Sequence, residues 1–313
     1  MKFPAYLSLP GRLWRVSGWR LWLAALWLLT INLCSLYLLS TWVAGQGVLL
    51  TGGWMDGRGA CRRLRLVDPP HPVTALASVP GSGSTWLRHL LHQTTGLATG
   101  SLYSDSSLTA AGFLGEGIHN SSVLVVKTHA SPSAMSQDFR QALLLMRNPY
   151  DVILAEFNRR QAGHLGHARE DDFATYWDSF VPEAAEFWRI VNTDWLDFPG
   201  RLLVVHYEQL VHSLNSTLSD ILHFLNITHT ASDLQCAATH SRGDFKRQEP
   251  REGRENILAK RFSSKHREFI HRCGMAVATK LSDTGHGHLP YSLVTPLYRM
   301  ENTRATGNYP GRT

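Results

Sequence analysis

The feature that most limits how this chain can fold is the apolar run from Leu21 to Ala44, which contains no Asp, Glu, Lys, Arg or His. As a helix it would cover roughly 36 Å, enough to cross the hydrocarbon core of a bilayer with some tilt. The cations that precede it, with no acidic residue among them, are Lys2, Arg12, Arg15 and Arg20. The positive-inside rule therefore predicts a type II topology, with residues 1–20 as a cytosolic tail, 21–44 as a transmembrane signal-anchor and the rest in the lumen.

A cleaved signal peptide is the alternative for this run. The apolar region of such a peptide covers roughly 7–15 residues, and the run here is longer. A buried core helix is disfavoured, because the run shows no polar face. We therefore expect this segment to anchor the protein in a membrane.

Composition and charge limit what the rest of the chain can do. Its 313 residues are 43% hydrophobic, which suffices for the core of one large domain or two small ones. Of the 31 Lys and Arg residues, four precede the apolar run, and the remaining 27 stand against 25 Asp and Glu. The predicted luminal part therefore lacks the basic excess that is typical of nucleic-acid-binding proteins.

Sequons and cysteines fit a luminal location. N-glycosylation is predicted at three Asn-x-Ser/Thr sequons, Asn120, Asn215 and Asn226. Cys34 lies within the apolar run, which leaves three cysteines in an oxidising lumen. We favour a disulfide between Cys236 and Cys273, since both lie in the carboxy-terminal third, and expect Cys61 to be available for a bridge to a second subunit of a homodimer. The sequence by itself does not decide the pairing.

One α/β domain is expected after a short stem. Gly, Arg and Pro dominate the stem, residues 45–72, and the folded domain is expected over residues 73–313. Short β-rich apolar runs alternate there with longer helical segments, which is typical of a parallel sheet covered by helices. The expected strands are Val73–Val79, Val123–Lys127, Ala142–Met146 and Leu202–His206. The expected helices are Trp86–Gln93, Pro149–Arg160 with Asn148 as its cap, Phe173–Asn192, Ser216–Leu225 and Arg261–Lys280.

A glycine-containing loop, Pro80–Trp86, joins the first expected strand to a helix. A strand, such a loop and a helix amino terminus turn several backbone N–H groups toward one point and cradle an anion. Ser82, Ser84 and Thr85 can donate hydroxyl hydrogen bonds or cap the helix. By itself such a loop is more often an ordinary turn. It is not the Walker A motif of a nucleotide kinase or another P-loop NTPase, because no Gly-Lys-Ser/Thr closes it.

Three further segments carry cations that suit the same site. The second strand ends in Lys127-Thr128-His129, and ligands of open α/β sheets bind at the carboxyl ends of strands. His129 is the candidate base for an attacking hydroxyl group, because an ordinary pKa of about 6.5 suits a mildly acidic lumen, and Lys127 is the candidate for neutralising charge on a transferred group. The third strand ends in Arg147, and a basic turn runs from Ser241 to Arg247. No His, Cys and carboxylate cluster predicts a metal site.

Taken in this order, the four segments resemble the sulfotransferase superfamily. Its Pro-Lys/Arg-x-Gly-Ser/Thr-Thr-Trp loop, Lys-Thr-His segment and Gly-Asp-Trp-Lys turn are similar to Pro80–Trp86, Lys127–His129 and Gly243–Lys246. The likeness is greatest to the WSC-domain-containing sulfotransferases, from about Val73 to Arg247, through Val-Lys-Thr-His, Arg-Asn-Pro-Tyr, Ala-Gly-His-Leu-Gly and Val-Val-His-Tyr-Glu. The chain has too few cysteines for the Cys-rich WSC modules themselves.

The resemblance implies the sulfotransferase fold, a P-loop-like parallel sheet flanked by helices, and a Golgi enzyme that uses 3′-phosphoadenosine 5′-phosphosulfate (PAPS). It implies that the loop holds the 5′-phosphosulfate, that Arg147 holds the 3′-phosphate and that His129 takes the proton of the acceptor. The implied acceptor is a sialic-acid-bearing glycan. The residues that it assigns to PAPS are Gly81, Ser82, Gly83, Ser84, Thr85, Trp86, Arg147, Arg242, Lys246 and Arg247.

Two positions depart from the family pattern. Gly81 stands where most sulfotransferases have a Lys or Arg that contacts the bridging oxygen, and Ala155 where cytosolic members have a Ser on the 3′-phosphate. Losing one such contact typically costs on the order of 10²–10³ in rate. Lys127 is the candidate replacement for the first, and Asn148 or Arg242 for the second. The departures keep open an alternative function, a luminal glycan-binding protein that has this fold and transfers nothing.

Overall fold

The computed structural model describes residues 61–135, 138–243, 245, 247–248, 252–291 and 293. The chain divides into two compact units, Met1–Trp54 and Met55–Thr313, and the described residues belong to the second. The predicted tail, the predicted transmembrane segment and most of the predicted stem therefore lie outside the described residues. Within the described part of the chain, no helix combines the length and the hydropathy that a membrane span requires.

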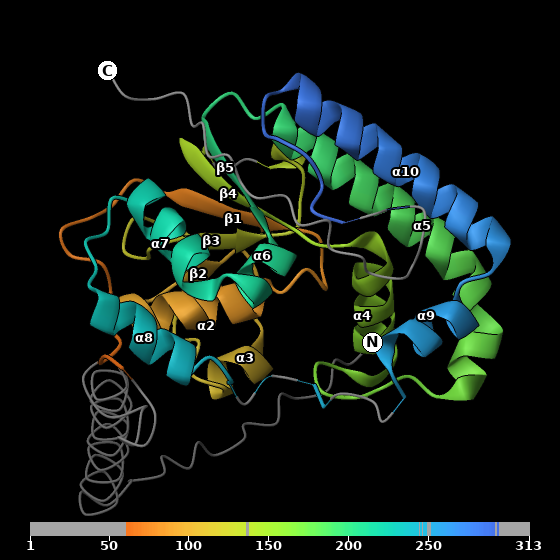
Figure 1. The fold of residues 1–313 in the computed structure, drawn as a ribbon. Coiled ribbons are helices and arrows are strands. Elements are labelled where there is room, and N and C mark those ends of the chain that lie inside the picture. Colours follow the sequence, from red (N-terminus) through yellow and green to blue (C-terminus); the bar gives the residue numbers. More distant parts are fainter. Residues whose placement is uncertain are drawn as a thin grey trace, which may run out of the picture. The chain divides into compact units, whose positions relative to one another are not determined.

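Five parallel strands form one sheet in the order β2-β3-β1-β4-β5 (Figure 1). Their bounds are β1 Thr74–Ser78, β2 Gly100–Ser101, β3 Val126–Thr128, β4 Gln141–Met146 and β5 Arg201–His206. The four predicted strands are all present and pair in parallel, which confirms the expected α/β parallel sheet. The sequence did not predict β2, because two residues are too few to show a strand period. β3 is shorter than predicted, since Val123–Val125 are buried but do not pair in a regular ladder.

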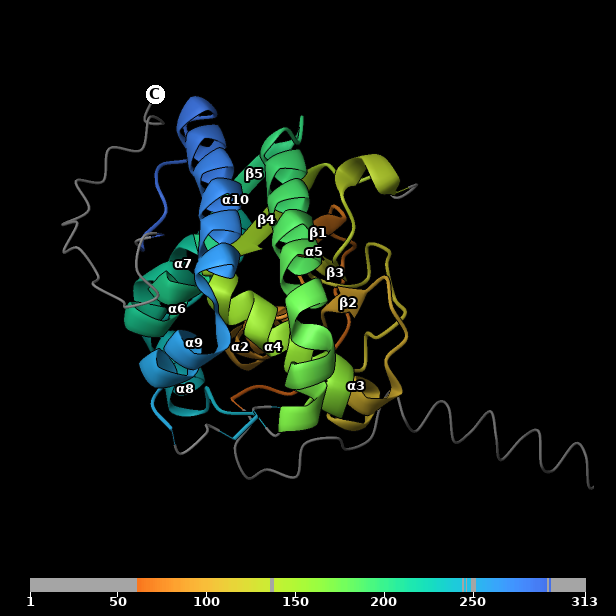
Figure 2. The ribbon, with the colours of Figure 1, turned by 90° about the vertical axis from the view of Figure 1, so that its right-hand side faces the viewer.

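Helices cover both faces of the sheet. The long helices α5 (Glu170–Leu196) and α10 (Ser264–Asp283) lie side by side over one face, as both views show (Figures 1 and 2). Successive residues of a strand point to opposite faces of the sheet, so alternate residues pack against the two layers of helices. Ala75 and Leu144 face the core that contains Trp188 of α5, whereas Leu76 faces the core that contains Leu90.

The opposite face is covered by shorter helices, which include those nearest the site. The core on that face contains residues of α2 Ser84–Thr95, α6 Tyr207–His212, α7 Leu214–Phe224 and α8 Ala231–Thr239. The helices α4 Pro149–Ala162 and α9 Arg254–Arg261 instead share a core with α5 and α10. The remaining elements are α3 Ser106–Ala110 and a 3₁₀ turn, η1, at Pro132–Ala134. All five predicted helices are present, as α2, α4, α5, α7 and α10. The predicted cap is also confirmed, because the Asn148 side-chain oxygen accepts a hydrogen bond from the Tyr150 N–H at 3.0 Å. The four unpredicted helices, α3, α6, α8 and α9, are too short to show a clear helical period.

The disulfide joins Cys61 to Cys236, with an S–S distance of 2.10 Å, and Cys273 is a buried free thiol. The predicted Cys236–Cys273 pair is therefore wrong, and Cys61 is not available for a bridge to a second subunit. The reason is the layering: Cys236 lies in α8, which belongs to the α2 side of the sheet, whereas Cys273 lies in α10 on the other side. His240 Nδ1 lies 3.5 Å from the Cys236 sulfur. Sulfurs bonded to each other offer no thiolate ligands, so these three side chains make no metal site in this form.

Candidate active site

The carboxyl ends of β1, β3 and β4 open into a pocket of about 1310 Å³. The pocket gathers most of the side chains that the sequence singled out. The predicted residues that line it are Gly81, Gly83, Ser84, Thr85, Trp86, Lys127, His129, Arg147, Arg242 and Arg247. Lys246 lies outside the described residues, and Ser82 is not part of the lining. The structure thus brings together residues that are more than 150 positions apart in the sequence.

The loop after β1 presents backbone amides rather than side chains. Gly83 is the N-cap of α2, with φ 97°, and no side chain caps the helix. The first amides of a helix have no acceptor within it, so the N–H groups around Thr85 are open toward the pocket. The Ser82 N–H donates to the Val79 carbonyl at 3.1 Å, and the Ser82 hydroxyl is buried with no partner among the described residues. The open N–H groups of the loop are therefore those at the helix end.

The two departures from the family pattern lie against each other. Gly81 has φ 91°, and a Cβ at this position would lie 2.8 Å from the Val152 carbonyl oxygen and 3.3 Å from the Ala155 Cβ. A side chain at residue 81 therefore has neither a relaxed backbone conformation nor space. The absent loop cation follows from this close packing of the loop on α4.

His129 is oriented by a hydrogen bond to β1. Its Nδ1 lies 2.7 Å from the Ser78 carbonyl oxygen, which can only accept, so Nδ1 is assigned as the donor and Nε2 as the basic nitrogen of the neutral ring. Burial lowers the pKa of His129 to about 4, with a further lowering by the Lys127 charge, although the Ser78 contact raises it. The expected ordinary pKa is therefore wrong, because the sequence did not show how deeply the ring is buried.

Lys127 lies two residues before His129 and is almost completely buried, with 5% of its surface exposed. Burial lowers its pKa to about 8, and nearby charges act in both directions, with Glu116 raising it and Arg88 lowering it. The ammonium group therefore remains mainly protonated at neutral and acidic pH. It is a suitable cation for charge on a transferred group.

Arg147 connects the loop to the end of β4. Its Nη1 donates to the Gly81 carbonyl at 3.0 Å, and its guanidinium lies 4.2 Å from the centre of the Tyr207 ring. The Trp188 indole N–H in turn donates to the Arg147 carbonyl at 3.0 Å. These contacts hold the guanidinium at the pocket wall, close to the amino terminus of α2.

The basic turn is attached to α2 through its backbone. The Trp86 indole donates to the Ser241 carbonyl at 2.9 Å, which brings the turn to the loop. Arg242 is exposed, whereas Arg247 is half-buried and donates to the Gly163 carbonyl at 3.3 Å. Burial lowers the pKa of Arg247, and the Arg147 charge lowers it further. Cations that repel one another across a pocket favour an anionic ligand between them.

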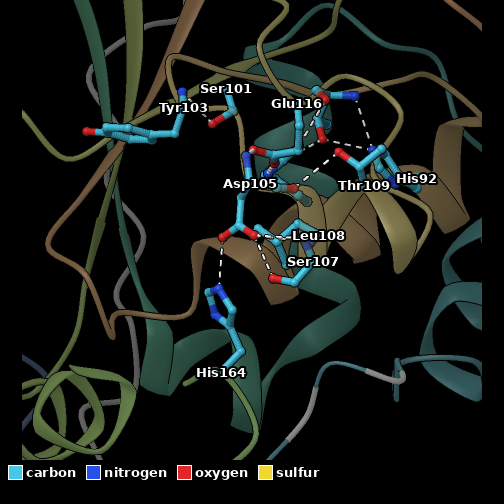
Figure 3. Close-up of polar contacts among 11 residues, drawn as sticks. His92, Ser101, Tyr103, Asp105, Ser107, Leu108, Thr109, Glu116 and His164 are labelled. Atoms are coloured by element: carbon cyan, nitrogen blue, oxygen red, sulfur yellow. Dashed lines mark hydrogen bonds and ion pairs between the residues drawn. The ribbon is translucent and has the colours of Figure 1, made fainter. Parts of the chain in front are cut away.

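The sequence missed a polar network on the other wall of the pocket, which Figure 3 shows. Arg88 of α2 is fully buried and forms an ion pair with Glu116, and its Nε donates to the Thr99 hydroxyl at 2.8 Å. Glu116 accepts from the Asp105 N–H at 3.5 Å, and Asp105 caps α3. His164 Nε2 lies 2.8 Å from the Asp105 carboxylate, which joins the α4–α5 loop to this wall. Burial raises the pKa of Asp105, but the contacts with Ser107 and His164 outweigh it and lower the pKa to about 2.

Comparison with known proteins identifies this arrangement. A family model described as Sulfotransferase domain matches residues 114–276. WSCD family members from Drosophila melanogaster and Aedes aegypti are 44% and 43% identical to the chain over 180 residues. Each match covers 56% of this chain and 57% of the relative, so the chain spans little more than half the length of the curated relatives it matches. Mouse sulfotransferase SULT7A1 complexed with PAP is similar with a TM-score of 0.46 and 15% identity, over 70% of this chain and 87% of that one. The family model and the WSCD relatives confirm the resemblance found in the sequence.

Proposed function

The chain belongs to the sulfotransferase domain family, and from that premise we propose that it is a PAPS-dependent enzyme that sulfates a hydroxyl group of a glycan. The observation that carries the proposal is the convergence, in one pocket, of an uncapped helix amino terminus, the Arg147 guanidinium and an oriented neutral imidazole at His129. The first two suit a donor with several negative charges. The third suits removal of a proton from an acceptor hydroxyl.

The charge pattern of the pocket fits PAPS. The open amides from Gly83 to Trp86 and the cations Arg147 and Arg247 would hold its phosphate groups, with Arg242 and Lys246 as further candidates. Arg247 supports this fit, because its Nε is buried without a hydrogen-bond partner among the described residues. When bound, PAPS supplies the sulfuryl group together with a stable leaving group. The proposal needs no metal ion.

The residues of the chain supply a base and a cation. With Nδ1 held by the Ser78 carbonyl, the Nε2 lone pair of His129 takes the proton of the acceptor. Lys127 offsets negative charge that develops on the departing oxygen, which is the task that a loop cation at residue 81 performs elsewhere in the family. Both side chains come from the end of β3, so the strand sets their spacing.

We further propose that the acceptor is a sialylated glycan and that the enzyme is a type II protein of the Golgi membrane. The resemblance of the sequence to the WSC-domain-containing sulfotransferases supports this acceptor. Arg159 offers a cation for an acidic sugar, because it lines the pocket while two hydrogen bonds of 2.6 and 2.7 Å hold it on Glu156. The three sequon asparagines, Asn120, Asn215 and Asn226, are all exposed, as glycosylation in the lumen requires.

The test is transfer of ³⁵S from labelled PAPS to a panel of sialylated and neutral glycans by the full-length chain in detergent. We expect transfer to at least one sialylated acceptor, and expect His129→Ala to abolish it without weakening PAPS binding. His119→Ala is the matched control, because His119 is exposed and lies outside the pocket lining. PAPS binding without transfer to any glycan would favour the alternative, a glycan-binding protein that has lost catalysis through Gly81 and Ala155. Absence of both binding and transfer would refute the proposal.

A further inference from the structure

Strand pairing places Tyr103 beside the two candidate catalytic side chains. In the parallel register of β2 and β3, Ser101 pairs with Lys127, and the Leu102 N–H donates to the Lys127 carbonyl at 3.0 Å. Tyr103 comes two residues after Ser101 and His129 two residues after Lys127, so both follow the paired ends of the two strands. Tyr103, Lys127 and His129 all line the pocket.

Tyr103 makes three contacts with Lys127 and His129, one with the backbone and two with the side chains. Its hydroxyl oxygen accepts a hydrogen bond from the His129 backbone N–H at 2.9 Å. Its ring stacks on the His129 imidazole, with centroids 5.3 Å apart and an angle of 20° between the planes. The Lys127 ammonium lies over the same ring, 5.6 Å from its centre. One side chain thus contacts both candidate catalytic groups.

The backbone of Tyr103 is itself held in place. Its N–H donates to the Ser101 hydroxyl at 3.0 Å, and its carbonyl accepts from the Gly117 N–H at 2.8 Å. Two residues further on, the Asp105 N–H donates to the Glu116 carboxylate at 3.5 Å (Figure 3). The side chain is nevertheless 37% exposed, so it is not a core residue whose removal would leave a cavity.

We propose that Tyr103 is a positioning residue of the sulfuryl transfer, holding the His129 imidazole plane and the Lys127 ammonium in their working geometry. This inference rests on the proposed function. The hydrogen bond to Ser78 fixes one ring nitrogen but leaves the ring free to tilt about that bond. Stacking on Tyr103 removes the tilt, so the two contacts together fix the direction of the Nε2 lone pair. The aromatic face also favours the charged form of Lys127, whose own surface is only 5% exposed.

Two variants test the contributions of the ring and of the hydroxyl group of Tyr103 separately. Tyr103→Phe keeps the stacking and removes one hydrogen-bond acceptor, so kcat should fall by about fivefold or less. Tyr103→Leu removes both, and a misplaced base typically costs about a hundredfold, so kcat should fall by about ten- to a hundredfold. The KM for PAPS should change by less than about twofold in both, since Tyr103 makes none of the donor contacts. Tyr176→Leu is the matched control, because Tyr176 is 52% exposed and outside the pocket lining.

A measurement without turnover keeps this inference distinct from the proposed function. NMR titration of the full-length chain, with labelled histidine rings and His129→Gln for assignment, reports the His129 ring directly. In Tyr103→Leu the ring loses its stacking partner and becomes wetter, so its ring-current shift should disappear and its pKa should rise. These changes together with the selective loss of kcat would support the positioning role. If the wild-type chain transfers no sulfate, the proposed function fails while the titration still decides whether Tyr103 holds His129. The positioning role of Tyr103 would be overturned by unchanged His129 signals or an unchanged kcat in Tyr103→Leu. It would also be overturned if Tyr103→Leu and the Tyr176→Leu control lost kcat and melting temperature equally.

Discussion

Gly81 offers the sharpest test of how the loop is built. Because the family pattern has a cation at this position, it predicts that Gly81→Lys would raise the activity of the enzyme. The structure predicts the opposite, because residue 81 has φ 91° and a Cβ would lie 2.8 Å from the Val152 carbonyl oxygen. That oxygen belongs to the backbone of α4, so no change of a neighbouring side chain, such as Ala155→Gly, relieves the contact.

Gly112 supplies a matched control, because its φ of 92° is nearly the same and no atom lies within 4 Å of an added Cβ. Gly112→Ala therefore measures backbone strain alone, which costs about 1–3 kcal/mol. Gly81→Ala should lose that amount and a further ~1–3 kcal/mol for overpacking. At roughly 2–4 °C per kcal/mol for a domain of this size, Gly81→Ala should melt about 2–12 °C below Gly112→Ala.

Thermal unfolding of the two alanine variants and of Gly81→Lys, followed by circular dichroism, measures these differences, and PAPS binding is measured on the same samples. We expect Gly81→Lys to be at least as destabilised as Gly81→Ala and to bind PAPS no better than the wild type. Equal melting temperatures for Gly81→Ala and Gly112→Ala would refute the packing argument. A Gly81→Lys variant with higher activity than the wild type would show that the loop has room for the cation.

Three further predictions concern other parts of the chain. Since the neutral form of His129 is the base and its pKa is lowered to about 4, kcat/KM should stay level from pH 7 to about 5 and fall only as the pH drops through about 4. At pH 5.5 an imidazole with a pKa of 4 is about 97% neutral against about 9% for an ordinary one, so a loss of about tenfold at that pH would contradict the burial argument. Cys236→Ser should lower the free energy of unfolding by about 2–4 kcal/mol. Peptide mapping of the wild-type chain should recover Cys61 linked to Cys236, with Cys273 as a free thiol. Glu116→Gln should cost about 3–5 kcal/mol, because Arg88 would be left as a buried charge without its ion-pair partner; unchanged stability in urea unfolding would rule this out.

The sequence predicted the part of the site that depends on local order. A strand, a glycine-containing loop and a helix follow one another within Val73–Gln93, and Arg147 and Asn148 are likewise adjacent to the strand and helix that they connect. These patterns can be recognised in the sequence because the residues that form them are neighbours in the chain. The carboxyl ends of parallel strands then bring them to one edge of the sheet.

The remainder of the site depends on pairing between distant segments. Tyr103 acquires its place only through the register of β2, a strand of two residues with no periodic pattern of its own. Arg88 appears in the sequence as an ordinary helix residue, and its partner Glu116 is 28 positions away. The lowered pKa of His129 and the Cys61–Cys236 bond were missed for the same reason, since burial and layering are properties of the assembled domain.

The Cys61–Cys236 bond also decides how mechanical force enters the domain. Tension on Cys61 divides at the sulfur bridge, because one covalent path runs through Cys236 into α8 and the other along residues 62–73 into β1. β1 is the central strand of the sheet and carries the loop and the start of α2 at its far end. The bond thus gives such tension a second path into the domain, besides the path that leads into β1.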